Sequence, residues 1–121
     1  MANIADYEEN RLLDYSLDTD AHVALFTSDP TDADTGTEVS AGGYSRQTAT
    51  FSAAASGSKS TSSDIVFGPA TGSWGTVTHV AIYDAATAGN LKWHGPLDAA
   101  KTIASGDEFK LSSGDLTASL D

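Results

Sequence analysis

A change of hydrophobic period near residue 22 constrains the fold more than any other feature of the sequence. From that point on, short apolar runs alternate with turns rich in Gly, Pro, Asp and Ser. In the clearest run, 76–83, alternate side chains would point to opposite faces of a strand. One face would carry Val77, His79, Ala81 and Tyr83, and the other Thr78, Val80 and Ile82. Because both faces are largely apolar, we expect this strand to be central in a sheet.

About eight runs of this kind follow one another, with turns between them. They predict strands at 22–27, 44–51, 65–67, 76–83, 91–95, 101–104, 108–111 and 116–120, with a further short strand considered at 37–40. The run 44–51 suits an exposed or edge strand, and 76–83 pairs with 91–95 as a hairpin. Strands spaced by about 8–12 residues are typical of an antiparallel sandwich or barrel.

The first segment differs from the rest, because 4–17 contains neither Gly nor Pro and is predicted to be helical. Asn3 is suited to be its N-cap, and Asp6 places a carboxylate near the helix N-terminus. A chain of 121 residues fits a single core. We therefore predict a helical arm at 1–20 and one antiparallel β-sandwich or barrel-like domain at 21–121.

Two segments are predicted to make assembly contacts. The apolar side chains of the helix do not form one stripe at helical spacing; they are Ile4, Tyr7, Leu12, Leu13, Tyr15 and Leu17. Residues 52–63 carry too few large apolar groups to offset their ordering entropy. We expect this loop, with Ser56, Ser58 and Ser60, to be mobile or ordered by a partner. Removing the helix should leave a folded domain that no longer assembles.

The charge balance excludes several partners. With 17 acidic and 6 basic side chains, the formal net charge is −11, which disfavours direct binding of nucleic acid or of an anionic membrane. No apolar run approaches the roughly 20 residues that span a bilayer. The acidic N-terminus is unlike a signal peptide. Because the chain has no Cys, thiolate metal sites and cysteine nucleophiles are also excluded.

Three aspartates form the strongest candidate for a cation site. Asp29, Asp32 and Asp34 place carboxylates close together in one loop, as a calcium site requires. The spacing does not fit an EF-hand, because Gly36 comes one position early and no terminal Glu follows at the required distance. We therefore favour an acidic surface turn over a metal site.

The histidines offer the second candidate for chemistry. His22, His79 and His94 could join Asp84 in a metal or acid–base site. None lies at a recognised ligand spacing, and each falls within an alternating strand, so ordinary packed imidazoles are favoured. The sequence contains no nucleophile elbow or phosphate loop, and we expect neither an enzyme nor a bound cofactor.

Three further side chains are assigned structural roles. Trp74 and Trp93 are large hydrophobic anchors, for which core packing is favoured over a carbohydrate platform. Arg46 is one of two arginines in an acidic protein, and we expect it to pair in a bidentate manner with a carboxylate of its own or a neighbouring chain.

Five segments, taken together, resemble a family of small virion proteins of tailed bacteriophages, described as tail-fibre-like or head-decoration proteins. They are ADYEENRLLD at 5–14, VALFTSDPTD at 23–32, GTEVSAGGYSRQ at 36–47, WGTVTHVAIYD at 74–84 and GNLKWHGPL at 89–97. The resemblance covers nearly the whole chain in order. The chain departs from the family pattern at 16–21, where members often carry a longer linker before the first strand.

The resemblance implies a scaffold role. Glu38 and Arg46 are expected to pair across a hairpin, while the remaining scaffold positions supply turns and apolar bulk: Gly42, Gly43, Tyr44, Trp74, Gly75 and Trp93. It further implies a virion component that self-associates, with a trimer favoured. The leading hypothesis is a decoration protein on the capsid exterior, bound to the major capsid protein. The alternative is a tail-fibre module, bound to a tail protein and involved in host attachment.

Overall fold

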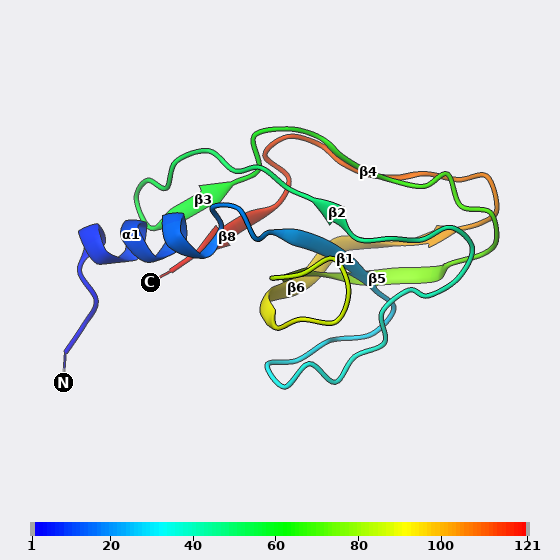
Figure 1. The fold of residues 1–121 in the computed structure, drawn as a ribbon, viewed down its shortest axis with the longest axis horizontal. Coiled ribbons are helices and arrows are strands. Elements are labelled where there is room, and N and C mark those ends of the chain that lie inside the picture. Colours follow the sequence, from blue (N-terminus) through cyan, green and yellow to red (C-terminus); the bar gives the residue numbers. More distant parts are fainter. Residues whose placement is uncertain (1, 121) are drawn as a thin grey trace.

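Strands make up most of the regular structure, as the alternating sequence pattern predicts. The computed structural model describes residues 2–120 (Figure 1). The elements in chain order are α1 (Asp6–Ser16), β1 (His22–Phe26), β2 (Gln47–Thr48), β3 (Ser58–Ser60), β4 (Ile65–Phe67), β5 (Gly75–Tyr83), β6 (Leu91–Ile103), β7 (Phe109–Leu111) and β8 (Thr117–Ser119). The mainly β class with a short N-terminal helix is therefore confirmed.

A four-stranded antiparallel sheet, ordered β2-β1-β5-β6, forms one layer. Strand β5 lies between β1 and β6, which confirms that the most apolar run is internal. The predicted β5–β6 hairpin is present, and the Asp84 carboxylate stabilises its turn by accepting bonds from the backbone N–H and side-chain amide of Asn90. The ladders β3–β8 and β4–β7 form the second layer with α1 (Figure 1). The described strands form a sandwich and do not close into a barrel.

Both faces of the β1–β5 pair are buried. The main core receives Val23, Leu25, Val77, Val80 and Ile82, and a smaller cluster on the other face consists of Ala24, Phe26, Ala81 and Tyr83. The prediction that Val77 shares a face with Ala81 and Tyr83 is wrong. A register shift between Val77 and His79, opposite 96–101 of β6, changes the alternation at that point.

Several predicted boundaries are also corrected by the pairing. The runs 91–95 and 101–104 are two ends of the one strand β6, whose middle bulges out of register with β5. The edge strand expected at 44–51 is reduced to β2, and 37–40 contributes only a bridge between Glu38 and Phe26. Hydrophobic period indicates that a segment is extended, but the partner strand decides where the ladder begins and ends.

Helix α1 begins at Asp6, with Ala5 as its N-cap, so the prediction of Asn3 as the cap is wrong. No side chain caps the first turn. Asp6, Glu8 and Glu9 lie there instead, and their negative charge favours the positive end of the helix dipole. Among the described residues, no helix is long and apolar enough to cross a membrane.

The inner side of α1 is part of the main core. Leu13 and Leu17 are 0% and 1% exposed and pack in the same cluster as the sheet residues Val23 and Ile82. The prediction that Leu13 and Leu17 make assembly contacts is therefore wrong. The expectation that the domain folds without its helix also conflicts with this packing, because removing α1 would uncover part of the core.

Replacing Leu13 by Ala tests whether α1 is an integral part of the fold. We expect a loss of about 2–5 kcal/mol in the free energy of unfolding, since the change leaves a cavity in the core. Leu12→Ala is the matched control: Leu12 is 39% exposed, so a change of about 0.5 kcal/mol or less is expected. Urea unfolding of both variants makes the measurement, and equal stabilities would contradict the assignment.

Candidate interaction surface

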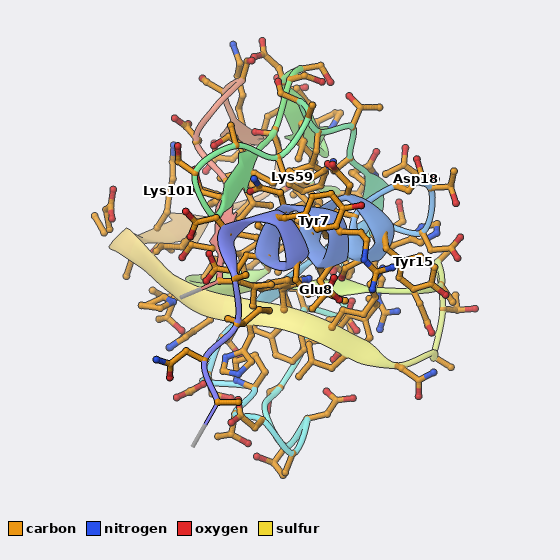
Figure 2. All side chains as sticks on the ribbon, turned by 90° about the vertical axis from the view of Figure 1, so that its left-hand side faces the viewer. Tyr7, Glu8, Tyr15, Asp18, Lys59 and Lys101 are labelled. Carbon is orange, nitrogen blue, oxygen red and sulfur yellow. The ribbon has the colours of Figure 1, made fainter. Side chains whose placement is uncertain are left out.

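The outer side of α1 carries strongly exposed aromatic side chains. Tyr7 and Tyr15 retain 78% and 85% of their exposure, and they lie about two turns apart on one side of the helix (Figure 2). Arg11 lies between them, and Leu12 is half-exposed beside them. We refer to Tyr7, Arg11, Leu12 and Tyr15 as the outer face of α1. Ile4, just before the helix, is also exposed, so these positions of the predicted assembly set do face solvent.

The Ser-rich segment 52–63, expected to be mobile or ordered by a partner, is bonded to α1 of its own chain. The Asp14 carboxylate accepts a bond from the Ala54 N–H at 2.9 Å, and the Asn10 side-chain oxygen accepts one from the Gly57 N–H at 3.0 Å. The segment also contains β3, which pairs with β8. Polar bonds to the helix replace the apolar contacts that this segment lacks.

The predicted serine contacts of this segment are made within the chain. The Ser60 hydroxyl bonds the Thr117 hydroxyl at 2.8 Å, and the Ser58 hydroxyl donates to the Ala55 carbonyl oxygen. Ser56 adopts a positive φ of 53° in the turn before β3. Ser58 and Ser60 therefore serve the local fold, whereas Ser56 is exposed, and a role of the three serines in assembly stays a prediction.

Lys59 is the clearest link between β3 and α1. Its side chain is only 7% exposed, and its Nζ lies 2.6 Å from Asp14 Oδ1. The bond from Lys59 lowers the pKa of the Asp14 carboxyl, and the Ala54 N–H acts in the same direction. A buried ammonium needs such a partner, because its charge is otherwise poorly solvated.

Replacing Asp14 by Asn tests whether the helix orders this segment. The variant leaves the Lys59 ammonium without its carboxylate, and we expect faster amide hydrogen exchange at 54–60 than in the native protein. Glu8→Asn is the control, because the Glu8–Arg11 pair lies on the exposed side of α1. Unchanged exchange in Asp14→Asn would show that this bond does not hold the segment.

Arg46 and Glu38 form the bidentate pair expected from the sequence. Arg46 Nε lies 2.9 Å from Glu38 Oε2, and Nη2 lies 2.9 Å from Oε1. The Tyr44 hydroxyl donates to Glu38 Oε2 at 2.6 Å and accepts a bond from the Leu25 N–H at 3.0 Å. Through the Tyr44 hydroxyl, the Glu38 carboxylate therefore links the 28–46 loop to Leu25 of strand β1.

The remaining bonds of Arg46 reach the β5–β6 turn. Nη1 donates to the carbonyl oxygens of Ala85 and Ala88 at 2.9 and 2.7 Å. The guanidinium carbon lies 3.8 Å from the centroid of the Tyr83 ring, a cation–π contact. The Tyr83 hydroxyl in turn donates to Asp34. We call this set, Asp34, Glu38, Tyr44, Arg46 and Tyr83, the Arg46 network.

The electrostatics of the Arg46 network favour a fully formed ion pair. Partial burial alone would raise the pKa of Glu38, but the bonds from Arg46 and Tyr44 outweigh it, so this pKa lies below its ordinary value. Burial, with the bond to Glu38, raises the pKa of Tyr44 far above its usual range. The pKa of Tyr83 is raised for the same reasons, burial first and the bond to Asp34 second. Both tyrosines therefore stay neutral donors at ordinary pH.

Glu38→Gln tests the contribution of the ion pair. The Arg46 side chain is 8% exposed and Glu38 is 26% exposed. Removing one partner of a buried pair costs about 3–5 kcal/mol, and the residual exposure of Glu38 places the expected loss near 3 kcal/mol. Urea unfolding gives the value, and Glu8→Gln on the exposed Glu8–Arg11 pair serves as the control, with little change expected.

Comparing the native protein with Glu38→Gln also gives the pH dependence of the stability that the ion pair contributes. Because the folded pKa of Glu38 is below its unfolded value of about 4.3, its stabilisation is fully present above that pH. It is lost as pH falls through the lower folded pKa. The stability difference between native protein and Glu38→Gln should therefore be constant near neutrality and shrink in acid. A difference that persists at the lowest pH would contradict this role.

Gly42 and Trp74 support the Arg46 network, because Trp74 packs against Tyr44. The Trp74 side chain is 4% exposed, and its indole N–H donates to the Gly42 carbonyl oxygen at 2.9 Å. A Cβ on Gly42 would clash with the backbone of Gly72, so no larger residue fits there. The Tyr44 ring packs edge-on against Trp74. The other predicted turn positions, Gly43 and Gly75, have φ of +77° and +80°.

The three aspartates of the candidate cation site do not converge. Asp29 accepts a bond from the Thr31 N–H, Asp32 lies 2.7 Å from the Nε2 of His94, and Asp34 is bonded by Tyr83. The His94 ring also approaches Asp29, with its Nδ1 3.9 Å from Asp29 Oδ1, whereas Asp34 is held by a separate neighbour. Across 2–120, no group of three or more His, Cys, Asp or Glu side chains is arranged to hold a metal ion.

The histidines lie apart from one another. His22 and His79 stand at opposite ends of the β1–β5 ladder, since His22 is paired with Tyr83 and His79 with Phe26. His94 lies on β6 beside Asp32, a contact that no sequence pattern predicted. The structure therefore does not bring the three imidazoles together with Asp84.

Trp93 lines a hollow that sequence reasoning missed. A cavity of about 460 Å³ opens between β6 and the β7–β8 region, and its lining includes Ile82, Trp93, Leu97, Phe109 and Leu116. Trp93 is partly buried, with its indole N–H bonded to the Ser16 hydroxyl. Because these side chains come from strands that are distant in sequence, no local motif could have indicated the cavity.

A comparison with known protein families gives a match over nearly the whole chain. A family model described as "Podophage GP4 fiber I protein gp80" matches residues 3–119. The match begins before α1 and ends with the last residue of β8, so it includes every helix and strand described above. A search of curated proteins finds no significant match.

Proposed function

The chain belongs to the family of the podophage GP4 fiber I protein gp80, a family of tailed-phage virion structural proteins, and we propose that it is a structural module of the viral fibre. The family description favours the fibre over the head. In this role the protein would be anchored to a neighbouring virion protein, which we take to be a tail protein.

The observation that carries the proposal is the two-sided character of α1. Leu13 and Leu17 on its inner side pack in the core, while Tyr7 and Tyr15 on its outer side are exposed to solvent. Exposed tyrosines on a rigid element are typical of protein–protein contacts, because they add contact area at low entropic cost. The helix thus supports a fixed attachment surface.

We propose a structural role without catalysis or a bound cofactor. The groups with the largest pKa shifts, Tyr44 and Tyr83, donate to Glu38 and Asp34 within the Arg46 network. That network joins the 28–46 loop to the β5–β6 turn, and so its polar groups are used to hold loops in place. The net charge of −11 favours protein partners over nucleic acid or an anionic membrane.

A capsid decoration protein is the second candidate. The described residues form one compact two-layer unit rather than an elongated shaft (Figure 1), a shape that suits attachment to the outside of the head. The partner would then be the major capsid protein, with symmetric self-association, a trimer being the state we favour.

Locating the protein in purified particles tests the proposal. A fibre module should be labelled by antibody at the tail and should appear in few copies by quantitative mass spectrometry. Labelling over the head with copies in proportion to the major capsid protein would favour the decoration role instead. Absence of the chain from washed particles would overturn both forms of the proposal.

A further inference from the structure

The chemistry of the outer face of α1 identifies the kind of partner that it binds. Resting on the proposed function, we infer that this face is a docking surface for a basic virion protein, one that presents Arg or Lys side chains, and not for a second copy of this chain. The exposure of the two tyrosines and the internal pairing of the chain's cations both favour such a partner.

The geometry of α1 separates its two sides cleanly. Leu13 and Leu17 point into the core, whereas Tyr7, Arg11 and Tyr15 follow one another at spacings of four residues on the opposite side. Figure 2 shows Tyr7, Glu8, Tyr15 and Asp18 on the side of the molecule that faces the viewer. Both phenol rings are therefore available as flat contact surfaces next to carboxylates.

The cations of the chain are largely used internally. Five of its six Lys and Arg side chains bond oxygen atoms of this chain: Arg11 to Glu8, Arg46 to Glu38, Lys59 to Asp14, Lys92 to Ser16 and Asp20, and Lys110 to Asp64. Carboxylates remain in excess on the surface, since the chain has 17 of them. The field around the fold is therefore negative.

The segment that contains α1 is also acidic. From residue 6 to residue 20 there are six acidic side chains, and Arg11 is the only basic one. Glu8 is bonded by Arg11 and Asp14 by Lys59, whereas Asp18 follows the helix on the exposed side (Figure 2). A partner surface must therefore offer positive charge together with groups that pack on tyrosine rings.

Arginine and lysine meet both requirements. Their cations are attracted to the face of a tyrosine ring and form charge-assisted hydrogen bonds with carboxylates such as Asp18. A second copy does not meet the charge requirement, because pairing two outer faces would bring two acidic helices together. Any self-association of this protein should therefore use a different surface.

Rebinding to particles tests the inference. Particles of the encoding phage, made without this chain, are mixed with purified full-length protein, and bound protein is quantified at low and high salt. For Tyr7→Ala/Tyr15→Ala we expect at least about a tenfold loss of binding with unchanged thermal stability. Val66→Ala, which alters an exposed apolar residue on β4, is the control and should bind like the native protein.

A charge pair of variants tests the partner's sign. Asp18→Lys should weaken binding, whereas Glu108→Lys, an exposed position before β7 with the same change in net charge, should not. Binding of the native protein should also weaken as salt rises. If Asp18→Lys binds normally, or if salt has no effect, a basic partner is ruled out.

The remaining outcomes separate the inference from the proposed function. Normal binding of the double tyrosine variant would overturn the docking surface while leaving the virion role intact. An oligomer of the purified protein that dissociates in the tyrosine variant would show that a second copy occupies the face, and would overturn the inference. If the native protein does not bind and is absent from normal particles, the proposed function itself fails.

Discussion

The burial of both faces of the β1–β5 pair is the constraint on which the rest of the structure depends. Apolar side chains on both sides of two paired strands require a cover on each side. One cover is the second layer, with α1, β3–β8 and β4–β7 around the main core. The other is the 28–38 loop and the 84–90 turn, which lie on the opposite side of the sheet (Figure 1).

The second cover is polar and acidic, so it cannot be held by hydrophobic contact alone. The Arg46 network holds it instead, because one guanidinium joins Glu38 to the carbonyl oxygens of the β5–β6 turn and lies over Tyr83, a member of the smaller apolar cluster. Helix α1 orders the Ser-rich segment by similar means, through Asn10 and Asp14. In both places a charged or polar side chain orders a segment with little apolar surface of its own.

Helix α1 links the fold to the proposed attachment. Its inner side belongs to the core and its polar side chains hold the neighbouring segment, so its position is fixed before any partner binds. The outer face of α1 is thus presented on a rigid support, which lowers the entropic cost of association. The same helix that completes the core is therefore suited to attach the protein to the virion.

Sequence patterns alone predicted the β class, the internal position of 76–83, its hairpin with β6, and a bidentate carboxylate partner for Arg46. Period-two patterns and the scarcity of arginine in an acidic chain are local signals, and local signals suffice for these features. The three-dimensional packing was needed to assign the sides of α1, the face of Val77 and the order of 52–63. Those depend on a bulge against β6 and on bonds between residues 40 or more positions apart, such as Asp14 with Ala54 and with Lys59. No periodicity along the chain records which distant group will supply the partner.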